Sequence, residues 1–116
     1  MSRDFTDFLE DILVYSKRAR EVVASTQMSA LTELSVESLA LIRCMEVIGE
    51  AVKKIPQDVR ANHPEVKWRE AAGIRDILIH QYWAANVAIL VDAVEKDLPD
   101  IERVVKQILA DQNTAT

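Results

Sequence analysis

Hydrophobic residues recur every three to four positions along most of this chain, which is the spacing of helices with one buried face. The pattern predicts four helices, over residues 4–24, 35–55, 67–80 and 86–110. Ser35 is the best N-cap residue for the second helix, and Asn86 or a residue just before it caps the fourth. Residues 28–34 are ambiguous and fit one helical turn, and residues 56–66 form a linker with room for a short helix. We therefore expect an all-α fold of four to five helices.

The last predicted helix contains a proline, Pro99, in its interior. The apolar register from Val87 to Leu109 nevertheless runs unbroken across it, and a step of about 100° per residue puts Pro99 on the polar side. We therefore expect a helix that is kinked or briefly interrupted near Pro99, and not two unrelated helices.

The second predicted helix has an unusually wide apolar arc, while Arg43, Glu46, Glu50 and Lys53 share one narrow stripe. A helix in a small monomeric bundle usually needs a narrower apolar face. Two interpretations stay open: a central helix surrounded by the others, or a helix shared between the core and a dimer interface. The charged stripe is typical of a salt-bridged polar face.

Composition agrees with this fold class and limits the possible functions. The chain has 116 residues, the size of one domain, and residues 1–116 are interpreted as a single helical domain. The chain has only two glycines and three prolines, so it has few of the residues that form the tight turns of β-hairpins. Apolar runs stay shorter than the roughly 18 residues of a membrane span, and the charged N-terminal segment is unlike a signal peptide. Cys44 is the only cysteine, so an intrachain disulfide is excluded and a cytoplasmic location is expected.

The titratable residues add two expectations. Cys44, His63 and His80 lack a recognisable metal-ligand spacing, so we expect neither a metal site nor another cofactor. The formal net charge of −5 argues against broad electrostatic binding of nucleic acid, but it leaves room for a local basic cleft. An acidic surface also suits a basic partner.

Candidate chemistry lies in the third predicted helix and just beyond it, in residues 73–83. A helical wheel assigns one face to the core, with Ile74, Ile77 and Leu78. The opposite arc holds, in angular order, Arg75, Ile79, Asp76 and His80. An apolar Ile79 within this polar arc is either incidentally exposed or part of a contact surface between two copies.

Arg75 and His80 together suit RNA cleavage without a metal ion. Histidine moves protons near neutral pH, and arginine holds phosphate through a bidentate fork. An RNA 2′-hydroxyl can then attack its neighbouring phosphate, and Asp76, one helical turn before His80, can orient the imidazole. On spacing alone, however, an arginine and a histidine on the polar side of an amphipathic helix are ordinary.

The motif Arg75-Asp76-x-x-x-His80-x-Tyr82 resembles the R-x4-H-x-Y signature of HepT-like toxins in the HEPN superfamily. Three flanking segments are also similar to that family: EVIGEAV at 46–52, HPEVKWREAAGIR at 63–75 and KDLPD at 96–100. The resemblance thus covers nearly the whole chain.

The resemblance implies an up-and-down helical bundle that forms a homodimer, with a metal-independent endoribonuclease site in the cleft between the subunits. Arg75 and His80 are then the catalytic pair, and Asp76 is the polar support. The resemblance also implies a type VII-like toxin–antitoxin system. In that system a cognate MntA-like nucleotidyltransferase antitoxin silences the toxin by attaching AMP to Tyr82, and the two proteins can form larger hetero-oligomers.

Two positions depart from the family pattern. The support position is often Asn and is Asp76 here, which adds a negative charge beside the phosphate site. The position before the tyrosine is often Gly and is Gln81 here, which changes how freely Tyr82 can swing out. A second interpretation, favoured by the acidic charge, is a non-catalytic helical dimer that binds a nucleotide or a nucleotidyltransferase partner. A plain helical scaffold is a third, for which the resemblance leaves little room.

Overall fold

The structure, a computed structural model, describes residues 4–32, 34–80 and 86–114, and all regular secondary structure in these residues is helical. The helices are α1 (Phe5–Ser25), η1 (Met28–Ala30), α2 (Val36–Lys53), α3 (Gln57–Ala61), α4 (Trp68–His80), α5 (Val87–Lys96) and α6 (Leu98–Thr114). The all-α prediction is confirmed. The single turn η1 lies in the ambiguous segment, α3 lies in the predicted linker, and α5 and α6 together occupy the predicted fourth helix.

Both predicted N-caps are present. The Ser35 hydroxyl accepts a hydrogen bond from the backbone N–H of Ser38 at 3.1 Å, which satisfies a free donor at the start of α2. The Asn86 side chain accepts from the backbone N–H of Ala88 at 2.9 Å at the start of α5. These polar residues therefore set where the two helices begin.

The predicted interruption near Pro99 is also confirmed. Helix α5 ends at Lys96, and α6 begins at Leu98, so Pro99 stands in the first turn of α6, where its missing N–H is not needed. The backbone N–H of Asp97 still donates to the carbonyl of Ala93 at 2.8 Å. A single residue, Asp97, therefore separates the two helices.

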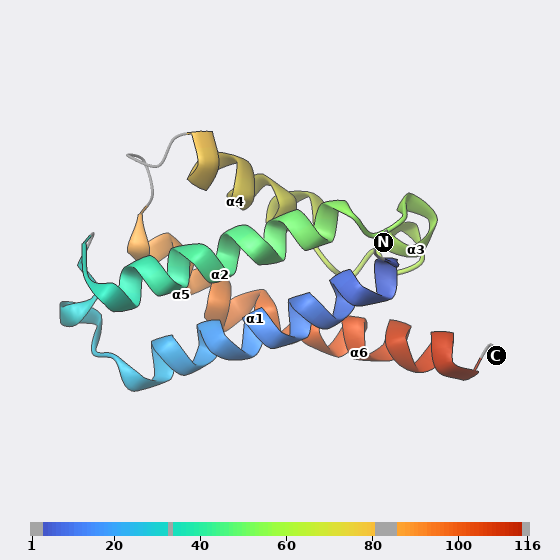
Figure 1. Cartoon of the computed structure of the whole chain (residues 1–116), viewed down its shortest axis with the longest axis horizontal. Helices are drawn as coiled ribbons and strands as arrows, with labels where there is room; N and C mark the ends of the chain where they lie inside the picture. The colour runs from blue at the N-terminus through green and yellow to red at the C-terminus, as the bar shows by residue number, and fades with distance from the viewer. Residues whose placement is uncertain (1–3, 33, 81–85, 115–116) are drawn as a thin grey trace.

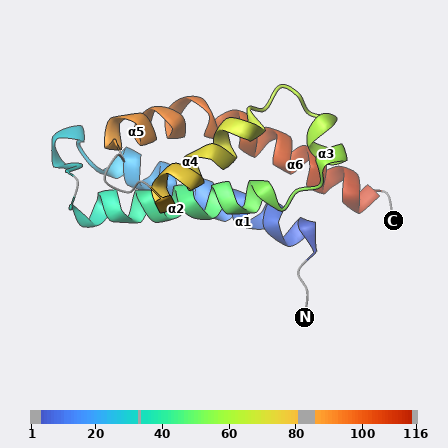
Figure 2. The ribbon, with the colours of Figure 1, turned by 90° about the horizontal axis from the view of Figure 1, so that it is seen from above.

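Helix α2 lies at the centre of the bundle (Figure 1). It runs antiparallel to α1 on one side and antiparallel to α4 on the other, and it also packs on α5. Helices α5 and α6 lie behind α1 and α2, as the view from above shows (Figure 2). This central position explains most of the wide apolar arc of α2. It leaves Leu39 half exposed, at 51 %.

The core is built mainly from the apolar faces of α1, α2, α5 and α6, and α4 adds Trp68 and Leu78. Its largest fully buried side chains are Leu9, Ile12, Leu41, Ile48, Ile55, Leu98, Val52, Val94, Val104 and Val105. One ion pair crosses its edge, where Arg20 Nε of α1 lies 2.9 Å from Glu102 Oε1 of α6. None of the described helices is long and apolar enough to cross a membrane.

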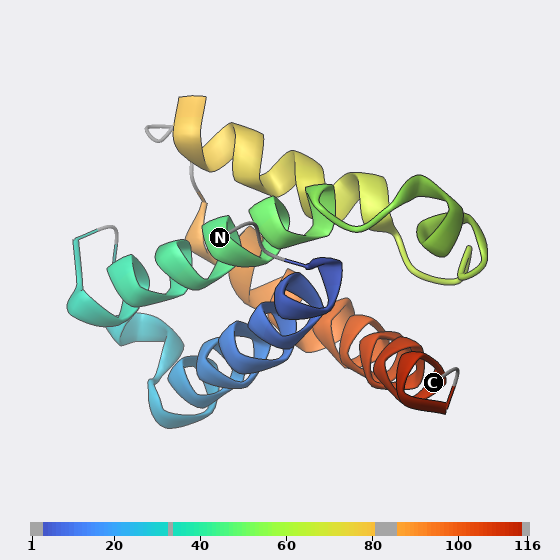
Figure 3. The same cartoon turned by 45° about the vertical axis from the view of Figure 1, so that its right-hand side comes forward.

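Helix α4 is the peripheral helix, packed on α2 and only weakly against the others (Figure 3). Leu78 is buried and Ile74 half-buried, as predicted. The prediction that Ile77 belongs to the core is wrong, because its side chain is 48 % exposed. A helix that packs on a single neighbour buries a narrower stripe than a helix that lies inside a bundle.

Candidate active site

The contact between α2 and α4 is unusually close at Gly49. A Cβ atom on this residue would lie 2.4 Å from the Cβ of Arg75 and 3.0 Å from the carbonyl oxygen of Ala71. Glycine in a helix interior costs about 0.5–1 kcal/mol relative to alanine, so a mid-helix glycine needs a packing reason. Here the reason is the approach of α4, which places the backbone of Arg75 directly against α2.

Arg75 is held from both helices. Its Nε lies 3.1 Å from Glu50 Oε2 on α2, and its Nη1 donates to Asp76 Oδ1 on α4 at 3.3 Å. The Arg75 side chain keeps 27 % of its surface exposed. A guanidinium bound on two sides loses much of its rotamer freedom before a ligand arrives, so its charge is presented in a defined place.

Asp76 is a carboxylate shared between two cations. Besides Arg75, it accepts a hydrogen bond from Lys53 Nζ on α2. The hydrogen bond from Lys53, followed by that from Arg75, holds the pKa of Asp76 below its ordinary value. The carboxyl group is therefore ionised at neutral pH, and its charge is compensated by Lys53.

A groove of about 240 Å³ runs beside Arg75, where α1, α2 and α4 meet. Arg75 and Ile79 supply its α4 wall, and Arg43, Glu46 and Glu50 are among the residues that α2 contributes. The Ile79 side chain is 42 % exposed. From the sequence, Ile79 is either incidentally exposed or part of a contact surface between two copies. Both interpretations require this apolar side chain to be exposed, as it is here.

The structure describes the side chains of only some of the predicted site residues. Arg75 and Asp76 lie together on α4 and are joined by a hydrogen bond. His80 is the last residue of α4, but its side chain is not among those that the structure describes. Tyr82 and Gln81 lie in the segment 81–85, outside the described residues. The contact between Asp76 and the His80 imidazole therefore stays a prediction.

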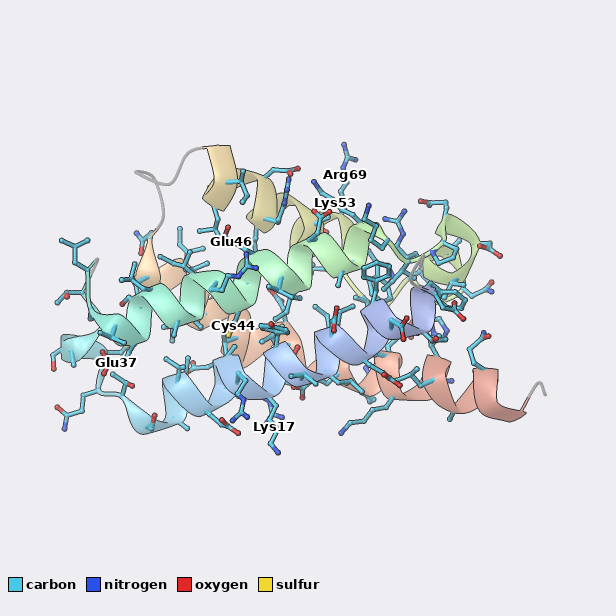
Figure 4. All side chains as sticks on the ribbon, viewed as in Figure 1. Lys17, Glu37, Cys44, Glu46, Lys53 and Arg69 are labelled. Carbon is cyan, nitrogen blue, oxygen red and sulfur yellow. The ribbon has the colours of Figure 1, made fainter. Side chains whose placement is uncertain are left out.

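The sequence interpretation missed the α2 side of this site. The charged stripe of α2 is paired across the helix interface, since Glu50 reaches Arg75 and Lys53 reaches Asp76. Figure 4 shows Lys53 at the edge of α2 that faces α4, with Glu46 farther along the same helix. The signal that identifies this side is Gly49, because a glycine inside an otherwise regular helix marks a close approach of backbone.

Comparison with known proteins assigns this architecture to a family. A family model described as "Ribonuclease HepT-like" matches residues 12–108. The chain belongs to the HepT-like ribonuclease family of the HEPN superfamily. The matched range contains Gly49, Arg75 and the segment from His80 to Tyr82.

Individual HepT-like relatives match over almost their whole length. The protein "Putative RNase MJ1216" of Methanocaldococcus jannaschii is 36 % identical, over 94 % of this chain and 90 % of that protein. "Probable ribonuclease HepT" of Thermococcus cleftensis is 37 % identical, over 88 % of this chain and 93 % of that protein. The comparison with solved structures finds no significant match.

Proposed function

We propose that this chain is the toxin of a toxin–antitoxin pair and that it cleaves RNA without a metal ion through Arg75 and His80. The observation that carries the proposal is the preset guanidinium of Arg75, which is partly exposed at a groove and lies five positions before the histidine of the family signature. Membership of the HepT-like ribonuclease family supports the same reaction class.

In the proposed reaction, the 2′-oxygen of a ribose attacks the adjacent phosphorus and the bond from phosphorus to the 5′-oxygen breaks. The products are a 2′,3′-cyclic phosphate and a 5′-hydroxyl. His80 transfers the proton, as a base for the 2′-hydroxyl or as an acid for the leaving 5′-oxygen. Arg75 stabilises the negative charge that gathers on the phosphate oxygens in the transition state.

The charges around Arg75 decide how phosphate gains access to it. Glu50 lies on Nε and Asp76 on Nη1, so a phosphate that binds two nitrogens of the guanidinium at once competes with one of these carboxylates. Asp76 also has Lys53 as a partner. The extra negative charge introduced by aspartate at this position is therefore offset, and the departure from the family pattern is compatible with catalysis.

The test is cleavage of RNA by the purified protein in EDTA. His80→Ala should lose this activity while it stays folded by circular dichroism. His63→Gln is the control, because His63 is the only other histidine of the chain and its side chain pairs with Glu65, away from Arg75. If His80→Ala cleaves RNA at the wild-type rate, the assignment is wrong.

The proposal extends to regulation through Tyr82. An AMP group two residues after His80 would add phosphate charge and bulk that compete with RNA for Arg75. After co-expression with a MntA-like nucleotidyltransferase, the intact mass should rise by whole AMP units. Tyr82→Phe should abolish the increase, and Tyr15→Phe, which removes the only other tyrosine, should not. An unchanged mass in the wild-type protein would refute this part alone.

The proposed assembly is a homodimer in the cytoplasm, with the active site at the interface between the two subunits. The exposed Ile77 and Ile79 on the peripheral helix α4 support it. Gel filtration of the wild-type protein and of Ile79→Asp tests it. A monomer in both cases would contradict it.

A non-catalytic module that binds a nucleotide or a nucleotidyltransferase is the second candidate. The carboxylates on Arg75 and the net charge of −5 favour it. It predicts binding without RNA cleavage, and normal growth of cells that express this chain alone.

A further inference from the structure

A second groove lies on the side of α4 that faces α3. It has a volume of about 790 Å³, and we call it the α3–α4 groove. It is lined by Gln57, Arg60, Ala61, Pro64, Val66, Lys67, Trp68, Arg69, Glu70, Ala72, Gly73 and Asp76. Asp76 is also bound to Arg75, so this groove ends beside the guanidinium of the candidate active site.

The α3–α4 groove carries uncompensated positive charge. Among the residues that the structure describes, Arg60, Lys67 and Arg69 form no ion pair. Nη2 of Arg60 donates to the neutral side chain of Gln57 at 2.8 Å. Of the two acidic lining residues, Asp76 is already paired with Lys53, which leaves the carboxylate of Glu70 against three cations. A local basic surface on a chain of net charge −5 needs a functional explanation.

Gly73 supplies an independent observation. It lies in the interior of α4, where glycine is unfavourable relative to alanine. A Cβ atom there would have nothing within 4 Å, so, unlike Gly49, it is not needed for helix packing. Gly73 lines the groove one turn after Arg69 and one turn before Asp76. A bare stretch of helix at this position lets an external chain approach the backbone closely.

We propose that the α3–α4 groove binds the sugar–phosphate backbone of RNA that flanks the cleaved bond, with the strand crossing α4 at Gly73. This inference rests on the proposed ribonuclease function. The groove has a single aromatic lining residue, Trp68, which is buried and donates its indole N–H to the carbonyl of His63 at 2.9 Å. Since no aromatic ring is free to stack on bases, the groove recognises phosphate charge and not sequence.

The first test measures binding of a single-stranded RNA by fluorescence anisotropy at several salt concentrations. All proteins carry His80→Ala, so that the RNA stays intact. Three variants each remove one cation: Arg60→Gln, Lys67→Gln and Arg69→Gln. Each should make the slope of the logarithm of the binding constant against the logarithm of the salt concentration shallower by about 0.7. This change corresponds to about fivefold weaker binding at about 0.1 M salt. Lys17→Gln, on the opposite edge of the molecule from Arg69 in Figure 4, should change neither quantity.

The second test adds bulk without changing charge. Gly73→Leu should lower RNA affinity several-fold while its melting temperature stays at or above that of the wild-type protein, because leucine is the better helix former and the site is open. A purely structural glycine would give the opposite pair of results, a lower melting temperature and unchanged RNA affinity.

The outcomes separate this inference from the proposed function. If the wild-type protein cleaves RNA but the three cation variants bind it with the wild-type affinity and salt slope, the groove assignment is wrong and the ribonuclease stands. If these variants instead lose binding to the nucleotidyltransferase with RNA binding intact, the groove is a protein-docking surface and the inference is overturned. A wild-type protein that neither binds nor cleaves RNA refutes both.

Discussion

Replacing Gly49 by alanine is the most direct test of how the fold positions Arg75. The added Cβ would lie 2.4 Å from the Cβ of Arg75 and 3.0 Å from the carbonyl oxygen of Ala71. Carbon atoms in contact normally lie about 3.5–4.0 Å apart, so α4 must move away from α2 by about 1 Å. Neither neighbouring atom is the flexible end of a side chain, and local adjustment cannot absorb the clash.

Two consequences of Gly49→Ala follow with different magnitudes. Overpacking of this kind costs typically about 1–3 kcal/mol, and the better helix propensity of alanine returns about 0.5–1 kcal/mol. The net loss of stability should therefore be at most about 2.5 kcal/mol, which a folded domain can tolerate. A displacement of about 1 Å in a group that positions the reaction can, however, reduce the rate about 100-fold. We expect a folded protein with little activity.

The assay for Gly49→Ala pairs urea denaturation with single-turnover cleavage of RNA in EDTA. Gly73→Ala is the control for stability, because it introduces the same methyl group into α4 where nothing lies within 4 Å. It should stabilise the protein by about 0.5–1 kcal/mol. A folded Gly49→Ala protein that cleaves at the wild-type rate would refute the argument that close packing of α2 and α4 sets the position of Arg75.

Two further predictions concern charge pairs. Lys53→Met removes the largest cause of the lowered pKa of Asp76, so that pKa should rise toward its ordinary value in an NMR titration, while Lys54→Met should leave it unchanged. Because the folded-state pKa is lowered, this carboxylate stabilises the protein above its ordinary pKa, and the contribution disappears as the pH falls below that range. Arg20→Met leaves the largely buried Glu102 carboxylate without its partner, so urea denaturation should show a loss of about 1–3 kcal/mol; an unchanged midpoint would contradict this.

The fold was largely predictable from the sequence, because helix periodicity and capping residues act locally. Ser35 and Asn86 set helix starts through hydrogen bonds within one turn, and the apolar register fixed the continuity across Pro99. The exposure of Ile77 was not predictable in this way. It depends on how many helices surround α4, which is a property of the packed bundle and not of the segment itself.

The candidate site was predictable only on its α4 side. Arg75 and Asp76 belong to a compact motif, but their partners Glu50 and Lys53 lie 25 and 23 positions earlier in the chain. On a helical wheel these two residues are ordinary members of a charged stripe. Their role appears only when Gly49 brings α4 onto α2, because that packing places each charge opposite its partner.

On the two proposals above, RNA affinity and RNA cleavage belong to different surfaces of the molecule. At the candidate active site, Lys53 and Arg75 are balanced by Glu50 and Asp76, so this cluster attracts a phosphate no more than it repels it. In the α3–α4 groove, by contrast, Arg60, Lys67 and Arg69 form no ion pair with a described residue. On the proposals above, a single nucleotide at Arg75 would compete with a carboxylate for a bidentate contact, whereas an RNA strand would gain further phosphate contacts in the groove. The proposal therefore predicts that the protein binds RNA strands more tightly than mononucleotides, without recognising their base sequence.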